Sequence, residues 1–258
     1  MHKQTAKLIF PALGAGVLTL GLRLHMYKVG FDHKNILSSY HPLHLICLGI
    51  AILMALYLAL AVRKLNGSKH PRRNFPAHPL RDLATIAAGC LMAMHGIALF
   101  QEAAAILPRI RAGLALAAAG AMLLSPFVPR NKPTPQGLLH GIITVFFAVD
   151  MLCRYRDWSG NPQLPDYVFQ IFGCIGLCLC SYHRLAFDVE LGKRRMLLWC
   201  SMMGLYLCVA CVSGPETEIF YLGGSLWAGS CLCTPKPPAD FLADSPKATS
   251  EKQRENTL

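Results

Sequence analysis

The stretch Leu43–Val62, LHLICLGIAILMALYLALAV, decides the fold class because it runs for twenty residues without a charged side chain. A helix rises about 1.5 Å per residue, so this length is sufficient to cross the hydrocarbon core of a bilayer, which is roughly 30 Å thick. The stretch therefore predicts a membrane-spanning α-helix.

Seven further apolar segments flank this stretch in the chain. They are Leu8–Leu22, Leu83–Leu107, Ala112–Val128, Leu138–Cys153, Tyr167–Tyr182, Met196–Val212 and Ile219–Cys233. Because the bilayer core offers no water, each segment has to satisfy its own backbone hydrogen bonds, as a helix does. The sequence predicts an all-α polytopic transmembrane helical bundle of about eight spans, with residues 1–233 forming a single domain. The last segment is short for a full crossing, and a re-entrant segment is the alternative.

The composition excludes several other classes of protein. Hydrophobic residues make up 53% of the chain and charged residues only 15%, whereas an average soluble domain has roughly a quarter charged residues. An ordinary soluble enzyme, a nucleic-acid-binding domain and a disordered chain are therefore excluded. The chain has 11 cysteines, most of them inside apolar segments, so we expect buried free thiols rather than a secreted disulfide framework.

The net charge of +11 is explained by membrane topology. With eight spans, 18 of the Lys and Arg residues lie on one side and 7 on the other. The positive-inside rule then places both termini in the cytoplasm. We expect the cell membrane as the location, most simply a bacterial cytoplasmic membrane, with the lipid bilayer as partner and no nucleic acid. Residues 234–258 are polar and contain four prolines, which predicts a disordered cytoplasmic tail.

Ionisable residues inside a span are costly, so they are candidates for a functional site. Two acids qualify, Glu102 and Asp150, and both fall in the outer half of the predicted bundle. Arg154 follows Asp150 by one helical turn and can pair with it. With Arg23 and Gln170 at similar depth, these five residues predict an outward-facing pocket for a small polar or charged solute. The alternative is structural: an ion pair at the membrane interface and a glutamate reaching toward headgroup water.

His95 lies seven residues before Glu102, on nearly the same helix face. This spacing suggests a proton relay between them. A rise of about 10 Å separates the two residues, so they do not touch directly. A hydrogen-bonded packing histidine is the alternative.

Cys208 and Cys211 form a C-x-x-C pair near the end of the seventh segment. Such a pair is typical of redox proteins, although the strand and helix of the soluble motif are missing here. Small residues also let membrane helices approach closely. We therefore weigh helix packing against redox chemistry for these cysteines, and we read Gly113 and Gly120 as packing residues.

Phosphate-binding loops, nucleophile elbows, zincin motifs and ATPase signatures are all absent from the sequence. Neither a catalytic residue nor a cofactor is predicted. The sequence therefore favours a carrier over an enzyme. The favoured hypothesis is a small-solute or ion permease, or its membrane subunit. The alternatives are a membrane thiol/quinone redox protein using Cys208 and Cys211, and a non-catalytic membrane scaffold or assembly partner.

Overall fold

The structure is a computed structural model that describes residues 3–29, 42–63, 78–103, 105–129, 133–159, 164–189, 191–212 and 218–233. These residues form helices and no strand, which confirms the predicted all-helical class for the described part of the chain. The helices are α1 (Lys3–Val29), α2 (Pro42–Arg63), α3 (Pro79–Glu102), α4 (Ile106–Leu124), α5 (Pro133–Ser159), α6 (Leu164–Asp188), α7 (Arg194–Ala210) and α8 (Glu218–Leu232). The predicted tail, residues 234–258, lies outside the described residues.

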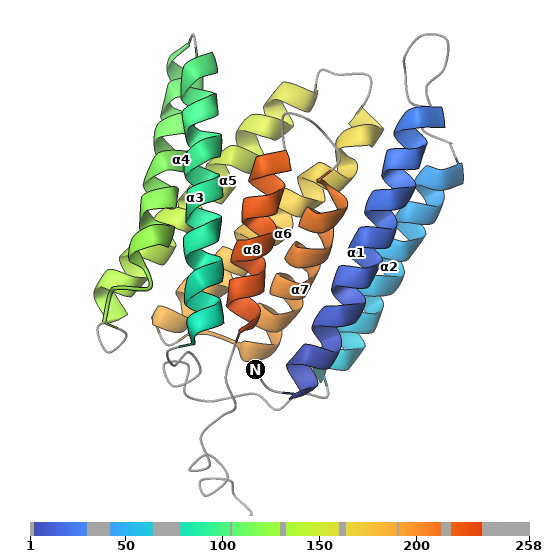
Figure 1. Cartoon of the computed structure of the whole chain (residues 1–258), viewed down its shortest axis with the longest axis horizontal. Coiled ribbons are helices and arrows are strands. Elements are labelled where there is room, and N and C mark those ends of the chain that lie inside the picture. The colour runs from blue at the N-terminus through green and yellow to red at the C-terminus, as the bar shows by residue number, and fades with distance from the viewer. Residues whose placement is uncertain are drawn as a thin grey trace, which may run out of the picture.

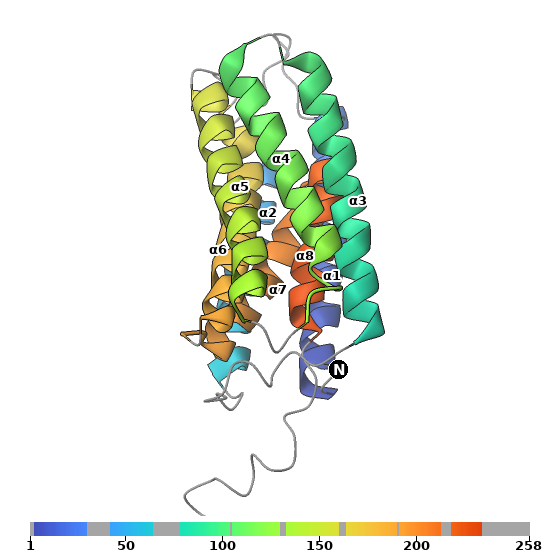
Figure 2. The same ribbon diagram turned by 90° about the vertical axis from the view of Figure 1, so that its left-hand side faces the viewer.

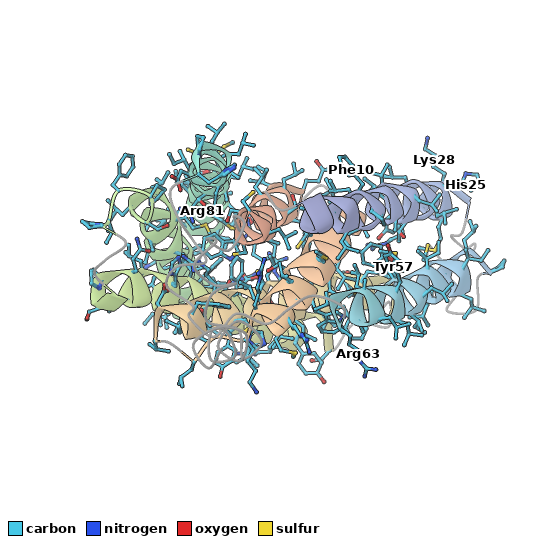
Figure 3. All side chains as sticks on the ribbon, turned by 90° about the horizontal axis from the view of Figure 1, so that it is seen from below. Phe10, His25, Lys28, Tyr57, Arg63 and Arg81 are labelled. Atoms are coloured by element: carbon cyan, nitrogen blue, oxygen red, sulfur yellow. The ribbon has the colours of Figure 1, made fainter. Side chains whose placement is uncertain are left out.

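Six helices, α1 to α6, are long and apolar enough to cross a membrane. Their outward faces carry large exposed apolar side chains, as expected where the surrounding solvent is lipid. On α1, Phe10 is 73% exposed, and α2 exposes Ile52, Leu53, Leu56 and Leu60. Figure 3, which looks at the bundle from below, shows side chains projecting outward from α1 and α2.

The two shortest helices, α7 and α8, have 17 and 15 residues and lie inside the bundle. α7 packs against α1, α2, α6 and α8, and α8 also packs against α3 and α6. Most of their side chains are consequently buried. Helices shielded by protein in this way need less apolar surface than helices that face lipid.

The other helices pack against this pair in two groups. α3, α4, α5 and α6 pack in sequence order, and α3 and α6 both reach α8, so these five helices close a ring. Figure 2 shows α3, α4 and α5 side by side in front of the inner helices. α1 and α2 form a hairpin on the opposite side of the molecule, where they pack on α7 (Figure 1).

The predicted third segment, Leu83–Leu107, is wrong at its end, because the chain turns before it. α3 stops at Glu102, Ala103 is extended with φ −75° and ψ 96°, and α4 begins at Ile106. Pro108 explains the early start of α4. Proline lacks the N–H that a continuous helix would need, but the first turn of a helix leaves its N–H groups unbonded anyway.

Glycines allow close contact between helices at several crossings. A Cβ on Gly176 of α6 would lie 3.0 Å from the Cα of Gly204 on α7. Gly176 and Gly204 thus form a close helix contact, whereas Gly113 and Gly120, which the sequence predicts as packing residues, have nothing within 4 Å of an added Cβ. α4 packs through small alanines instead, among them Ala115 and Ala119.

Candidate functional site

The helices alternate in direction, so α1, α3, α5 and α7 all finish at the same end of the bundle (Figure 1). We call this the far end, and the opposite end, where α1 begins, the N-terminal end. The residues predicted for the site all lie in the half of their helices nearer the far end: Arg23, Glu102, Asp150, Arg154 and Gln170.

Asp150 is the centre of a buried ion cluster between α4 and α5. Its side chain is fully buried, with 0% exposure. Oδ1 accepts a hydrogen bond from Nε of Arg111 at 2.7 Å, and Oδ2 accepts one from Nε of Arg154 at 2.7 Å. Charge-assisted bonds of this length are among the strong hydrogen bonds of proteins. Two guanidinium groups therefore share one buried carboxylate.

The guanidinium of Arg154 lies among aromatic rings. Its Cζ is 4.3 Å from the ring centroid of Phe220 and 5.8 Å from those of Trp158 and Tyr221. Cations are attracted to ring faces, and the attraction is larger where water is excluded. The rings thus compensate part of the cost of burying this charge.

His95 of α3 completes the cluster. Its Nε2 lies 3.5 Å from Nη2 of Arg154. A guanidinium N–H can only donate, so Nε2 is the acceptor in this contact. The ring also packs against Phe220 at 5.2 Å between centroids. Helices α3, α4, α5 and α8 therefore all contribute to the surroundings of one charge cluster.

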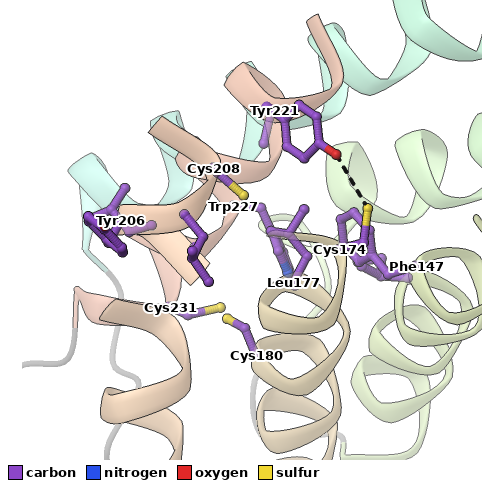
Figure 4. Packing of buried hydrophobic residues seen from close by; sticks show 14 of the residues in the cluster. Phe147, Cys174, Leu177, Cys180, Tyr206, Cys208, Tyr221, Trp227 and Cys231 are labelled. Carbon is purple, nitrogen blue, oxygen red and sulfur yellow. Dashed lines mark hydrogen bonds between the residues drawn. The ribbon is translucent and has the colours of Figure 1, made fainter. Parts of the chain in front are cut away.

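Gln170 and Tyr221 link this cluster to α6. The Tyr221 hydroxyl donates to the backbone oxygen of Gln170 at 3.0 Å and lies 3.6 Å from Sγ of Cys174 (Figure 4). Gln170 and Cys174 are one turn apart, on the same face of α6. The side chain of Gln170 is buried, and its Oε1 has no hydrogen-bond partner among the described residues.

Arg23 is also buried, but its contacts are with other residues. Its Nη1 donates to the backbone oxygen of Ala210 at 2.9 Å, and Nη2 donates to the hydroxyl of Tyr27 at 2.8 Å. Its Cζ lies 5.1 Å from the ring centroid of Phe169, the residue before Gln170. Arg23 thus joins α1 to α6 and α7.

The structure does not bring Glu102 into the buried cluster. Glu102 is the last residue of α3 and is exposed. The contact of His95 is with Arg154 and not with Glu102, so the described residues form no relay between the two predicted partners. The physical reason is the early end of α3, which leaves Glu102 at the surface of the far end.

The cysteines of the predicted redox pair are free and buried. Cys211 Sγ lies 3.6 Å from Nη1 of Arg23, whereas Cys208 faces α8, where its Sγ would be 3.4 Å from a Cβ on Gly224. Among the residues that the structure describes, no group of three or more His, Cys, Asp or Glu side chains is arranged to hold a metal ion.

A second polar cluster lies toward the N-terminal end. The ring of His140 on α5 hydrogen-bonds Asp188 on α6, and Nη1 of Arg184 is 3.9 Å from the same carboxylate. Close by, Nε1 of Trp227 donates to Oγ of Ser181 at 2.8 Å. His140 and Asp150 are ten residues apart on α5, which corresponds to about 15 Å.

An apolar layer separates the two polar clusters. Phe146, Phe147 and Leu177 are fully buried in the core. On α6, Leu177 lies between Cys174, which contacts Tyr221, and Cys180, whose thiol faces that of Cys231 (Figure 4). The core thus alternates from polar to apolar to polar along the helix axes.

The sequence reasoning missed two members of the site, Arg111 and Tyr221. Arg111 falls just outside the predicted segment Ala112–Val128, yet it lies in the second turn of α4. Its positive charge at the same end as Asp150 was the available signal. Tyr221 gave no signal, because its role depends on α8 packing beside α6.

Comparison of the chain with protein-family models, with curated proteins and with solved structures gives no match in any of the three.

Proposed function

We propose that this protein is an integral membrane permease for a small solute or ion, or the membrane subunit of one. In this proposal all eight helices cross the bilayer, both termini are cytoplasmic, and the far end faces outward. The unequal distribution of Lys and Arg supports the orientation. The enclosure of α7 and α8 by other helices supports their crossing despite their length.

The observation that carries the proposal is the burial of Asp150 between Arg111 and Arg154. Removing charges from water is expensive, and apolar residues of similar volume often stabilise a protein as well or better. Charged groups within membrane segments generally mark pathways for substrates, ions or protons. A scaffold needs only matching helix surfaces, so it gains nothing from such a cluster.

The site and the second polar cluster together support transport rather than binding alone. A permease needs polar groups that serve both sides of the membrane and a barrier between them. Here His140 and Asp188 lie toward one end, Asp150 lies toward the other, and Leu177 is part of the apolar layer between them.

The test compares Asp150→Asn with Asp157→Asn in reconstituted proteoliposomes. Asp157 is the matched control, since it is 64% exposed and lies 3.8 Å from the same Arg111. Concentration jumps of sodium, potassium, chloride, phosphate, small carboxylates and amino acids are followed by membrane current and by a trapped pH dye.

We expect the wild type to respond to at least one of these probes. Asp150→Asn should lower the response at least tenfold, and Asp157→Asn should leave it within twofold. Should the wild type give no signal above empty liposomes, or should Asp150→Asn transport normally, the permease proposal fails and the scaffold becomes the better explanation. His95→Gln is a second variant if Asp150→Asn does not fold.

A further inference from the structure

The cluster contains a buried amide oxygen without a hydrogen-bond donor. Oε1 of Gln170 has no hydrogen-bond partner in the described part of the chain, although the residue is only 6% exposed. Nearly all buried polar groups in proteins are hydrogen-bonded, and one that is not destabilises the fold. An unbonded buried amide therefore requires an explanation.

Gln136 shows how this protein treats the same side chain elsewhere. It is buried to the same extent, 6% exposed. Its Nε2 donates to the backbone oxygens of Ser125 and Val128, both at 3.0 Å. Gln136 is thus bonded as a structural residue, and Gln170 is not.

Arg154 also has donor capacity that its neighbours leave unused. It donates from Nε to Asp150 and from Nη2 to His95, and neither bond uses Nη1. A guanidinium carries five N–H donors in a planar fork that matches the oxygens of carboxylates and phosphates.

The buried part of the cluster carries a surplus of positive charge. The side chains of Arg111 and Arg154 are 13% and 5% exposed, and Asp150 is the buried acid between them. Asp157 also approaches Arg111, but at 3.8 Å and with 64% exposure its charge is largely screened by water. A buried surplus of this kind favours an anion over a cation or a neutral solute.

Tyr221 places the amide and the guanidinium near each other. Its hydroxyl is 3.0 Å from the backbone oxygen of Gln170, and its ring centroid is 5.8 Å from Cζ of Arg154. Gln170 shares its helix face with Cys174, which contacts the same hydroxyl. The amide therefore lies on the face of α6 directed toward the arginine.

We propose that the site binds a small oxyanion that also carries a hydroxyl group, such as dihydrogen phosphate or a hydroxycarboxylate. This inference rests on the proposed function and names its ligand class. The anionic oxygens accept from Nη1 of Arg154 and from the amide nitrogen of Gln170, and the hydroxyl donates to Oε1 of Gln170. One ligand thus satisfies the unused donors and the unused acceptor and balances the surplus charge.

The test is thermal unfolding of the full-length protein, purified in a phosphate-free maltoside detergent, at fixed sodium concentration and ionic strength. The probes are inorganic phosphate at pH 6, lactate, acetate and chloride. Dihexanoyl phosphatidate is added as a separate arm, because a lipid headgroup offers the same chemistry as free phosphate. Lactate and acetate differ in the hydroxyl group, so the pair isolates the role of the Gln170 acceptor.

We expect phosphate or lactate at saturation to raise the unfolding temperature by about 5 °C, and acetate and chloride to act at least tenfold more weakly. A response to the phosphatidate alone would support the same recognition and assign the ligand to lipid. Equal shifts with all four free anions, or none with any anionic probe, would overturn the inference.

Two leucine variants separate binding from folding. In Gln170→Leu, the rise in unfolding temperature caused by the anion should be at least tenfold smaller. The unfolding temperature without anion should stay equal or rise, because an unbonded amide has been removed. Gln136→Leu should unfold at a lower temperature and keep the anion shift. A retained shift in Gln170→Leu contradicts the proposal, and Gln170→Met takes its place if the leucine variant does not fold.

The result is independent of the transport assay. Oxyanion binding without any transport would leave the ligand class standing and remove the permease. Transport of a cation without oxyanion binding would support the permease and rule out the proposed ligand class.

Discussion

At the scale of single residues, the buried polar groups of this core fall into bonded and unbonded ones. Trp227 belongs to the first kind, since its indole nitrogen donates to Ser181 at 2.8 Å inside the core. Gln170 belongs to the second. The distinction matters because a bonded buried group stabilises the fold, whereas an unbonded one indicates a missing hydrogen-bond partner.

Trp227→Phe should destabilise the protein by about 1–3 kcal/mol, because it leaves the hydroxyl of Ser181 buried without its donor. The double variant Trp227→Phe, Ser181→Ala should recover part of this loss, since removing both partners leaves no unpaired group. Titration with a denaturing detergent in mixed micelles measures the free energy of unfolding of the single and the double variant. A double variant no more stable than Trp227→Phe alone would contradict the argument.

The local part of the site could be predicted from sequence, and the part that depends on packing could not. Asp150 and Arg154 are four residues apart on one helix, so their pairing follows from helix geometry alone. Arg111 meets the same carboxylate only because α4 packs on α5. Glu102 lies outside the buried cluster, since α3 ends at this residue and leaves it exposed, although the apolar run continues past it.

At the scale of elements, close helix crossings depend on which glycines face a neighbour. Gly113 and Gly120 have the spacing of packing residues but face open space, whereas Gly176 meets the backbone of α7. Hydropathy does not separate the lipid-facing from the protein-facing side of such helices, because lipid and protein neighbours are both apolar. Sequence periodicity therefore finds the helices of this protein but not the faces that touch.

Gly176→Leu should destabilise the bundle by about 1–3 kcal/mol or more, because its side chain has to displace the backbone of α7. An added Cβ at this position would already lie 3.0 Å from the Cα of Gly204. The control is Gly120→Ala, which meets nothing within 4 Å and should stay within about 0.5 kcal/mol. The test compares the melting temperatures of purified Gly176→Leu and Gly120→Ala. Equal values would show that the α6–α7 contact is loose.

At the scale of the whole molecule, the helices differ in what surrounds them. α2 exposes large apolar side chains to lipid, while α7 and α8 are enclosed by neighbours. The hydropathy pattern located all eight helices, yet six of them meet the length and composition expected of a span. The two that do not are inner helices, whose environment is protein, and no sequence pattern reveals that environment before the packing is known.

Epitope tags inserted into the full-length chain test the number of crossings. A tag after Gly214 should be reached by antibody in intact spheroplasts, and a tag after Leu258 only after permeabilisation. This result follows if α8 crosses the bilayer between the two positions. Tags on the same side of the membrane would show that α8 does not cross. In that case the number of crossings would be odd, and one of the two termini would not be cytoplasmic.

The packing of the N-terminal hairpin on α7 has a consequence for how the protein is made. Arg194, where α7 begins, follows the end of α2 by more than a hundred residues. At about 5–20 residues per second, the ribosome needs on the order of ten seconds to produce that length. Throughout that interval Arg23 has no carbonyl of Ala210 to bond, and headgroups or interfacial water have to solvate it. Insertion of this chain therefore follows the order of synthesis, while its assembly waits for a helix made near the end.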